Sequence, residues 1–516
     1  MTGTHLQHDV IEDLVGDLST SRTSHQRVDA PFTGKKIHDL PHSSLEDVAD
    51  AAQRARSAQL AWHLAGFNHR KSVLLKAHDL IVERRELLLD AVQTETGKTR
   101  GQAFEEVFQA ANVARYYAIS ARRALATHSR RGGIPTVIRT RVEYRPKGLI
   151  GIITPWNYPL SLAAMDALPA LAAGNAVLQK ADDQGALSIL ALRRAFIDAG
   201  VPPEVWGVVA GPGQVVGNAV NDESDYVCFT GSTATGTQVG IRAAEALRGA
   251  SLELGGKNPM IVLGDVDPVK AARNAVYACF SSMGQLCVSI ERIYVERSVA
   301  DAFTKEFVAR TAALVQSPAF DYSADAGSLT LPSQLTRVTE HVKDAVKLGA
   351  TALTGGRARP DLGPLFYEPT VLTGVTDAMK CSGEETFGPV VAITPVDSVE
   401  EAIIAANNTP FGLNASVFAR STRRAREVAH ALDAGSVNIN EGYRATFSSI
   451  DAPMGGVKKS GLGRRNGREG ILRFADSHTI AESTGLMTLP LTGVEFAKLS
   501  GMMVLALRVL KGIRRR

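Results

Sequence analysis

Short apolar segments alternate with longer segments of helical spacing over the middle of the chain, and this pattern constrains the fold more than any other feature. The apolar segments are residues 149–153, 177–180, 206–209 and 226–229, and helical spacing fills residues 187–198 and 237–247. Apolar strands joined by helices are typical of a parallel sheet that is covered on both faces. We therefore expect an α/β chain with a doubly wound parallel sheet.

Residues 148–165 contain no charged side chain. The length of this stretch suggests a membrane-spanning helix. However, Pro155 and Pro159 lie in the middle of the stretch, where a proline would break such a helix. We expect instead a buried strand at residues 149–153, a turn, and a helix that starts at Ser161.

The chain has 516 residues, which is too long for one typical core and indicates two or three domains. Hydrophobic residues make up 45% and charged residues 21% of the sequence, as in ordinary globular proteins. The formal net charge of +4 is small for this length, and no basic segment is interleaved with aromatic residues. We therefore expect no nucleic-acid partner. The polar stretch 1–29 lacks the apolar core of a secretory signal.

Four cysteines in so long a chain do not make a disulfide framework. They are Cys228, Cys279, Cys287 and Cys381, and none has the Cys/His spacing of a metal site, so we expect no metal and a reducing, cytoplasmic setting. Cys287 follows a glycine-containing turn at residues 283–285. Glycine lets a backbone approach a ligand closely, so this thiol can face a cleft, although a lone cysteine is more often a small buried hydrophobe.

Glycines also follow Glu253 and mark the start of a predicted helix. Glu253 precedes the glycine pair 255–256, although a solvated or capping carboxylate is the alternative. Residues 229–236 run from a strand into a helix and contain Gly231 and Gly236. A helix N-terminus offers free N–H groups to a pyrophosphate. The spacing differs from the standard dinucleotide fingerprint, and alone it is a weak signal.

These stretches, taken together, resemble the signatures of the aldehyde dehydrogenase superfamily. Other stretches that resemble the same family are residues 94–98 (Thr-Glu-Thr-Gly-Lys), 155–159 (Pro-Trp-Asn-Tyr-Pro), 169–175, 384–389 (Glu-Glu-Thr-Phe-Gly-Pro), 410–413 and 453–464. The resemblance extends from about residue 30 to about residue 485. It implies an α/β fold with a Rossmann-like cofactor domain, an α/β catalytic domain and a small β oligomerisation element.

By this resemblance, Cys287 is the nucleophile that attacks the carbonyl carbon of an aldehyde. The oxyanion that forms would be held by the Asn157 side-chain amide and by the backbone N–H of Cys287. Hydride transfer to a nicotinamide would leave a thioester, and Glu253 would activate the water that hydrolyses it. The implied activity is the NAD(P)-dependent oxidation of an aldehyde to a carboxylic acid.

The resemblance also implies which residues bind the cofactor, NAD or NADP. They are Trp156, Asn157, Lys180, Asp183, Gly231, Ser232, Leu254, Glu385 and Phe387. Lys180 would bind the adenosine ribose, Glu385 the nicotinamide ribose, and Phe387 would border the nicotinamide. Asp183 can accept a hydrogen bond from a free 2′-hydroxyl and repels a 2′-phosphate, which favours NAD but leaves NADP open.

The overall pattern is similar to actinobacterial succinate-semialdehyde dehydrogenases of the second type, so the implied substrate is succinate semialdehyde. A distal carboxylate would favour an arginine in the pocket. Arg444 is the candidate, and a solvated loop arginine is the alternative. Met454 stands where the family usually has an aromatic residue, so a broad-specificity aliphatic or aromatic aldehyde dehydrogenase remains open. Glu253 argues against a CoA-acylating relative, and Cys287 argues against a non-catalytic binding protein.

The expected domains follow the family. Residues 1–129 with 147–255 would form the NAD(P)-binding domain, residues 256–455 the catalytic domain, and residues 130–146 with 470–485 the oligomerisation strands. The family implies a homodimer or a homotetramer. Residues 489–516 combine apolar residues with lysine and arginine and predict a basic amphipathic helix. Such a helix can lie on a membrane surface; a docked helix or a loose tail are the alternatives.

Overall fold

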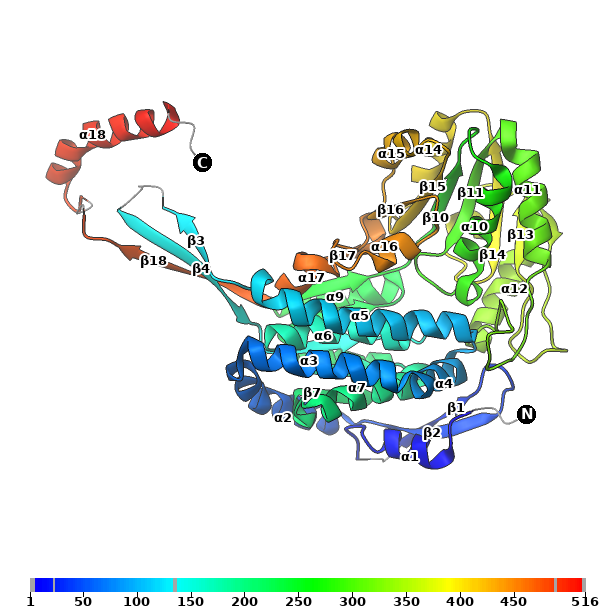
Figure 1. The fold of residues 1–516 in the computed structure, drawn as a ribbon, viewed down its shortest axis with the longest axis horizontal. Helices are drawn as coiled ribbons and strands as arrows, with labels where there is room; N and C mark the ends of the chain where they lie inside the picture. Colours follow the sequence, from blue (N-terminus) through cyan, green and yellow to red (C-terminus); the bar gives the residue numbers. More distant parts are fainter. Residues whose placement is uncertain (1–4, 22–23, 133–136, 487–489, 513–516) are drawn as a thin grey trace. The chain divides into compact units, whose positions relative to one another are not determined.

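A computed structural model describes residues 5–21, 24–132, 137–486 and 490–512 (Figure 1). The chain divides into two compact units. The larger unit comprises residues 1–124 and 146–475, and the smaller unit comprises residues 125–145 and 476–516. Both large sheets belong to the larger unit.

The first sheet has six strands in the order β17-β9-β8-β5-β6-β7. Its parallel strands are β5 (Leu149–Ile153), β6 (Ala176–Ala181), β7 (Trp206–Ala210), β8 (Tyr226–Thr230) and β9 (Gly249–Glu253). Every residue of the first four of these strands is buried, as continuous apolar runs require in a sheet covered on both faces. The strand order reverses at β5, so a ligand crevice is expected at the carboxyl ends of the strands there. The doubly wound α/β prediction is confirmed.

Helices pack on this sheet or on one another. They are α2 (Leu45–Leu64), α3 (Gly66–Glu83), α4 (Arg85–Thr96), α5 (Arg100–Ala124), α6 (Pro159–Ala173), α7 (Ala186–Ala199), α8 (Asn218–Glu223) and α9 (Thr233–Glu245). A reciprocal capping box between Ser44 and Asp47 starts α2. Gly97, with a φ of 70°, ends α4. Helix α6 begins at Pro159 rather than at the expected Ser161, because proline is well tolerated in the first turn of a helix.

The polar sequence of residues 1–25 predicts a loose arm, but the structure has a helix in this part. Helix α1 (His8–Val15) buries three apolar side chains. Pro31 and Gly34 predict a short hairpin at residues 30–40, and strands β1 (Ser24–Asp29) and β2 (Lys36–His42) form a longer antiparallel one. The apolar spacing of residues 70–96 predicts one helix, which the structure divides at Arg84 into α3 and α4.

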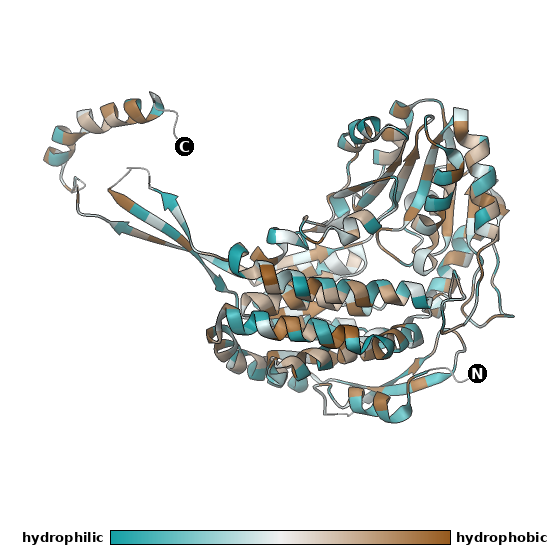
Figure 2. Cartoon of the chain, in the orientation of Figure 1, coloured by the Kyte–Doolittle hydropathy of each residue, from teal (hydrophilic) through white to brown (hydrophobic). Residues whose placement is uncertain are grey.

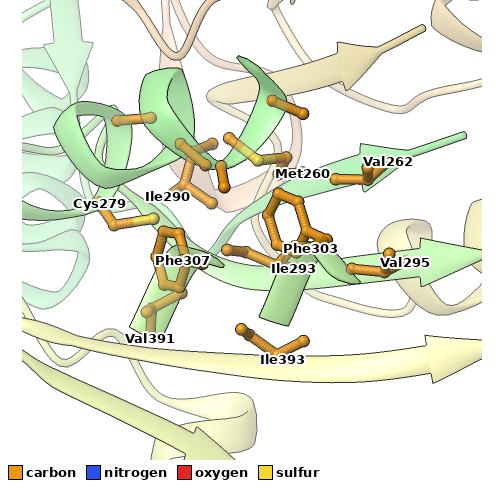
Figure 3. Packing of buried hydrophobic residues seen from close by; sticks show 14 of the residues in the cluster. Met260, Val262, Cys279, Ile290, Ile293, Val295, Phe303, Phe307, Val391 and Ile393 are labelled. Atoms are coloured by element: carbon orange, nitrogen blue, oxygen red, sulfur yellow. The ribbon is translucent and has the colours of Figure 1, made fainter. Parts of the chain in front are cut away.

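The second sheet has seven strands in the order β12-β13-β14-β11-β10-β15-β16, and only β12 runs antiparallel to its neighbour. The strands are β10 (Asn258–Val262), β11 (Ile290–Glu296), β12 (Thr351–Thr354), β13 (Thr370–Thr373), β14 (Val390–Val396), β15 (Asn414–Phe418) and β16 (Ser436–Ile439). The helices between them are α10 (Pro268–Phe280), α11 (Arg297–Ala312), α12 (Pro332–Lys347), α13 (Lys380–Gly383), α14 (Val399–Asn407) and α15 (Thr422–His430). Met260 and Ile293 of the sheet pack with Phe303 and Phe307 of α11 in one apolar core (Figure 3).

Residues 438–463 are rich in glycine, serine and proline, which predicts one long loop. In the structure this segment returns the chain to the first sheet. It contains helix α16 (Arg444–Ser448) and strand β17 (Gly461–Leu462), which pairs antiparallel with β9. A Cβ on Gly461 would lie 2.2 Å from the carbonyl oxygen of Leu252, so this pairing requires glycine. Helix α17 (Gly467–Leu472) then occupies the start of the region where a final strand was predicted from residue 471. Short 3-10 or π turns are η1 (Asp183–Gly185), η2 (Pro203–Val205), η3 (Gly213–Gly217), η4 (Ser281–Gly284) and η5 (Lys458–Ser460).

The smaller unit is built on a three-stranded sheet in the order β18-β4-β3. Its strands are β3 (His128–Arg131), β4 (Ile138–Pro146) and β18 (Ala475–Ser483). Helix α18 (Gly493–Gly512) follows and lies within the predicted tail. Residues 133–136 of the predicted oligomerisation strands, and residues 489 and 513–516 of the predicted tail, lie outside the described residues. Over the described ranges, no helix combines the length and the apolar character needed to cross a bilayer.

The expected limit between the cofactor and catalytic domains, at residues 255 and 256, falls in the connection between β9 and β10. The two sheets nevertheless belong to one compact unit. The division into two domains at this limit therefore stays a prediction.

Candidate active site

Cys287 lies on a loop with unusual backbone angles. The loop follows η4, where residues 282–284 have φ values of 48°, 56° and 68°. A Cβ on Gly284 would lie 2.1 Å from the carbonyl oxygen of Gly388, so the loop can take this path only with glycine there. Cys287 is partly exposed, whereas the other three cysteines of the chain are buried. Of the four cysteines, Cys287 is therefore the one that the loop leaves partly accessible.

The Asn157 side chain is hydrogen-bonded to the same loop. Its Nδ2 donates to the carbonyl oxygen of Gln285 at 2.9 Å, two residues before Cys287. The carbonyl oxygen of Asn157 accepts from Lys98 Nζ at 2.8 Å, and Lys98 also pairs with the buried Glu106. A side-chain amide nitrogen carries two N–H groups. One N–H of Asn157 thus remains for an oxygen atom near Cys287.

Glu253 is the last residue of β9 and lies at the carboxyl end of the first sheet. It is 4% exposed, and its Oε1 has no hydrogen-bond partner among the described residues. Burial raises the pKa of Glu253 to about 7, although the positive charges of Arg465 and Arg473 act in the opposite direction. A carboxyl group that titrates near neutral pH can both accept and return a proton.

The Cys287 thiol is surrounded by protein and by negative charge. Burial, followed by the charges of Glu253 and Glu385, raises the pKa of this thiol to about 12. The thiol is therefore protonated at neutral pH, and its reaction as a nucleophile requires an acceptor for the proton. Glu253, whose charge acts on this thiol and which lines the same cavity, is the candidate acceptor.

One cavity of about 670 Å³ brings most of the predicted site residues together. Its lining includes Cys287, Glu253, Asn157, Trp156, Gly231, Ser232, Leu254, Glu385 and Phe387. The volume is in the range of ordinary small-molecule sites. Three predicted residues, Lys180, Asp183 and Arg444, are not part of this lining.

The cavity includes the N-terminus of α9. Ser232 caps this helix by accepting from the backbone N–H of Thr235 at 3.2 Å, and Gly231 precedes the cap. A Cβ on Gly236 would lie 2.2 Å from Leu254 Cδ2, so glycine allows Leu254 to pack against the first turn. The first backbone N–H groups of a helix have no acceptor within the helix, which suits an anionic phosphate group.

Lys180 and Asp183 lie at the carboxyl end of β6, the neighbour of β5 in the first sheet. Lys180 is 6% exposed. Asp183 Oδ2 lies 3.1 Å from His42 Nε2, which belongs to the hairpin strand β2. No sequence pattern could pair Asp183 with this histidine, because 141 residues separate the two partners.

Glu385 and Phe387 are held by backbone and side-chain contacts from the second sheet. Glu385 Oε1 accepts from the backbone N–H of Gly256 at 2.8 Å. The carboxylate of Glu291, on β11, accepts from the N–H groups of Thr386 and Phe387 at 2.9 Å each, and Phe387 has a φ of 53°. The rings of Phe387 and Trp156 meet edge to face with centroids 5.6 Å apart.

Glu291 is itself held by a buried lysine that sequence reasoning missed. Lys257 Nζ pairs with the Glu291 carboxylate, and both side chains are almost fully buried. A lysine and a glutamate in a sequence are ordinarily solvated, so neither residue attracts notice on its own. The one available signal was the charged pair Glu291 and Arg292 inside an otherwise apolar strand.

Arg444, the predicted contact to a substrate carboxylate, begins α16. It donates to Glu441 at 2.9 Å and lies 4.2 Å over the centre of the Tyr277 ring. Tyr277 and Tyr443 both donate to Glu105, whose pKa is raised by burial. Arg444 therefore belongs to a polar cluster outside the lining of the Cys287 cavity, and its role stays a prediction.

Comparison with known proteins bears on what this cavity does. The model described as "Aldehyde dehydrogenase family" matches residues 19–480. The chain belongs to the aldehyde dehydrogenase family. This finding confirms the family resemblance inferred from the motifs around Cys287 and Glu253, and it identifies the protein as a family oxidoreductase.

Several relatives of this aldehyde dehydrogenase carry the name of a more specific activity. A Mycolicibacterium smegmatis protein named "putative succinate-semialdehyde dehydrogenase", with NADP(+) in its name, is 48% identical over 484 residues, which are 94% of this chain and 92% of that protein. A Mycobacterium ulcerans protein with the same type of name and the number 2 is 48% identical over 88% of each chain.

Solved structures show the same fold as this aldehyde dehydrogenase. An E. coli structure described as an NADP dependent enzyme has a TM-score of 0.87 at 33% identity and covers 90% of this chain and 96% of that one. A betaine aldehyde dehydrogenase from Staphylococcus aureus in complex with NAD+ has a TM-score of 0.87 at 29% identity and covers 96% of this chain and 100% of that one. The predicted aldehyde dehydrogenase fold is confirmed.

Proposed function

We propose that this protein oxidises an aldehyde to a carboxylic acid with NAD or NADP, through a covalent intermediate on Cys287. The observation that carries the proposal is that Cys287, Glu253 and Asn157 line one cavity with the N-terminus of α9. A nucleophile, a base, an oxyanion donor and a phosphate-binding helix end are thus combined in a single site.

In this scheme, the Cys287 sulfur attacks the aldehyde carbon as Glu253 accepts the thiol proton, which forms a thiohemiacetal. The free N–H of the Asn157 amide and the backbone N–H of Cys287 stabilise its oxygen. Oxidation of the carbon leaves a thioester, and Glu253 releases to solvent the proton that it took from the thiol. The ionised Glu253 then takes a proton from water as the water oxygen attacks the thioester carbon. The C–S bond breaks, the carboxylic acid leaves, and Glu253 returns the proton to the Cys287 sulfur.

The residues of the cavity fit a nicotinamide dinucleotide. The N-terminus of α9 suits the pyrophosphate, and Glu385, whose pKa is raised to about 8 by burial and by the charge of Glu291, offers acceptors to ribose hydroxyls. A Cβ on Gly255 would lie 2.4 Å from Glu385 Oε2, so glycine gives this carboxylate its position. When bound, the nicotinamide supplies the acceptor for the hydride that leaves the substrate carbon.

The preferred cofactor depends on Asp183. A free carboxylate there would accept from the 2′-hydroxyl of NAD and repel the 2′-phosphate of NADP. His42 Nε2 lies 3.1 Å from Asp183 Oδ2 and so occupies one oxygen of this carboxylate, which supports leaving NADP open. The mycobacterial relatives carry NADP(+) in their names. Both cofactors therefore belong to the proposal.

The proposed substrate is succinate semialdehyde. The mycobacterial relatives named for this substrate are 46–48% identical to the chain, and Arg444 is the candidate contact to its carboxylate. We also propose a homodimer or homotetramer in the cytoplasm, with the strands of the smaller unit in the subunit interface; light scattering would measure the assembly size.

The test is a panel of aldehydes assayed with NAD and with NADP on the wild-type chain and on Cys287→Ala. We expect at least a ~10³-fold lower turnover in the variant, because the covalent route is lost. Cys279→Ala, a change at a buried cysteine in the core of the second sheet, is the matched control and should keep most of the activity.

Near-normal turnover of Cys287→Ala would contradict the mechanism. Formation of a CoA thioester in place of the free acid would indicate an acylating enzyme instead. Activity with many uncharged aldehydes and none with succinate semialdehyde would overturn the substrate proposal but leave the chemistry intact.

A further inference from the structure

Helix α18 has 20 residues, and none of them is buried. Its exposed apolar side chains are Val494, Phe496, Met502, Val504, Leu505, Leu507, Val509 and Leu510. Figure 2 shows hydrophobic and hydrophilic segments alternating along this helix. An apolar surface of this extent on a soluble chain marks a site of interaction rather than a chance exposure.

Apolar side chains lie on most sides of α18. At 3.6 residues per turn, one apolar stripe is formed by Phe496, Leu499, Met503, Leu507 and Leu510. Lys498 and Arg508 lie on the other side of the helix together with Leu505 and Val509, and Lys511 lies beside Leu507 at the C-terminal end of the stripe. The stripe is therefore free of cations until the last turn of the helix.

The net positive charge of the chain comes from this segment. Residues 490–516 contain six lysines and arginines and one acid, Glu495, a net charge of +5. The whole chain has a net charge of +4, which leaves −1 for residues 1–489. Three of the six cations, residues 514–516, follow α18 in the sequence and lie outside the described residues.

We infer that α18 binds the surface of an anionic lipid bilayer. The apolar stripe enters the boundary between headgroups and acyl chains, and the cations remain among the phosphates. Helices with a lysine- and arginine-bearing side and a stripe of Phe and Leu bind membranes in this way. The attraction of each cation to anionic lipid strengthens binding about fivefold at moderate salt.

The same observations disfavour other occupants of this surface. Helix α18 is long enough to cross a bilayer, but it is not apolar enough to do so. A second copy of the helix would bring two groups of cations together, and the cores of protein interfaces are depleted in lysine. A nucleic acid would match the cations but would leave the apolar stripe in water.

The segment is also separable from the proposed chemistry. The family match ends at residue 480, before α18 begins. No residue of the Cys287 cavity comes from the smaller unit. Membrane attachment would therefore change where the enzyme acts and would leave the reaction at the cavity unchanged.

The experiment is flotation of the full chain with vesicles of phosphatidylcholine alone and with equal parts of phosphatidylglycerol and phosphatidylcholine. We expect binding to the anionic vesicles only, weakened by added salt. A chain truncated after residue 489 should lose this binding and keep its turnover with a soluble aldehyde.

A matched pair of variants separates insertion of the apolar stripe from attraction of the cations to anionic lipid. Leu507→Glu and Gly501→Glu each add one negative charge, but only the first disrupts the apolar stripe. We expect at least a tenfold loss of vesicle affinity for Leu507→Glu and about a fivefold loss for Gly501→Glu. Equal losses in both variants would show that charge alone attracts the chain, and would overturn insertion of the stripe.

Two other results would also overturn the inference. One is the absence of binding to anionic vesicles at low salt. The other is equal vesicle binding by the truncated chain. If truncation instead reduces the mass of the assembly in light scattering while vesicles bind neither protein, α18 is a contact between copies of the chain.

Discussion

Charges from three neighbouring elements act on Glu253, the proposed base. Arg465 forms two hydrogen bonds to Asp166, at 2.9 and 2.5 Å, and Arg473 donates to the same carboxylate at 2.6 Å. The three side chains are almost fully buried. The arginines lower the pKa of Glu253 and Asp166 raises it, as secondary effects on the larger rise caused by burial.

This arrangement predicts pH shifts of opposite sign from changes in one network. Glu253 acts as a base only when ionised. Loss of a positive charge in Arg465→Gln raises its pKa and should move the acidic limb of the kcat/KM profile to higher pH. Loss of a negative charge in Asp166→Asn lowers that pKa and should move the limb to lower pH.

The measurement is a pH–rate profile of each folded variant, checked by circular dichroism. Arg464→Gln is a milder companion, since Arg464 also lowers the pKa of Glu253 and is only half-buried. Besides these groups, Cys287 and Cys228 are electrostatically coupled to Glu253. A shift in the same direction for Arg465→Gln and Asp166→Asn would mean that the network acts through packing alone.

Arg444 supplies a second prediction at the scale of one residue. Arg444→Ala should raise the KM for succinate semialdehyde roughly tenfold, as expected for loss of a charge-assisted hydrogen bond, and should leave the KM for an uncharged aldehyde unchanged. Arg423→Ala, at an exposed arginine on α15, is the control. Equal effects on both aldehydes would remove Arg444 from substrate binding.

At the scale of elements, the N-termini of two helices are capped by buried glutamates that belong to other helices. Glu95 of α4 accepts from the N–H groups of Leu187 and Ser188, at the start of α7. Glu106 of α5 accepts from Leu160 and Ser161, at the start of α6. Each carboxylate satisfies N–H groups that a helix start leaves without acceptors. Helix α6 directly follows Asn157, and α7 directly follows the turn that contains Asp183.

The two caps predict different kinetic effects from the same substitution. Glu106→Gln and Glu95→Gln should each destabilise the fold by roughly 1–3 kcal/mol, because one N–H then faces an amide NH₂. Glu106→Gln should also lower kcat, since it releases the Lys98 contact to Asn157. Glu95→Gln should instead raise the KM for the cofactor. Thermal unfolding measures the loss of stability, and steady-state kinetics measure kcat and the KM for the cofactor. If both variants changed the same kinetic constant, the two glutamates would not have these separate roles.

What the sequence could predict at this scale depended on local pattern. Strands β5 and β8 were predictable because continuous apolar runs mark buried parallel strands. Helix α1 was missed because it is short and mostly polar, and the break at Arg84 has neither glycine nor proline to mark it. Strand β17 is two residues long and exists only through its pairing with β9.

The site shows the same limit. Cys287, Glu253 and Asn157 could be proposed from motifs, because each has glycine or proline neighbours that shape a turn. The residues that hold them could not. Lys98, Glu291 and His42 act through contacts across the fold, and no local sequence pattern predicts the partner of any of them.

At the scale of the whole molecule, the cavity is lined by both sheets of the larger unit. Gly231 and Leu254 come from the first sheet and its α9 connection, whereas Cys287, Glu385 and Phe387 come from the second sheet and its loops. A dinucleotide that contacts both sets should therefore stabilise the two sheets together.

We expect saturating cofactor to raise the melting temperature in a single transition. At a concentration one hundred times its Kd, a ligand adds about 2.7 kcal/mol to the free energy of unfolding. Differential scanning calorimetry with NAD and with NADP would rank the two without any turnover. No shift with either dinucleotide would contradict the proposed cofactor site, and AMP serves as the control for adenine binding alone.

The environment of Cys287 also has a consequence for the lifetime of the enzyme. Peroxides oxidise thiolates much faster than thiols. Burial and the nearby carboxylates keep the Cys287 sulfur protonated between turnovers. The resting protein should therefore resist inactivation by oxidants. Cys287 would then be open to rapid oxidation only during the brief interval in which it is a thiolate. In that interval an aldehyde is already present to react with it.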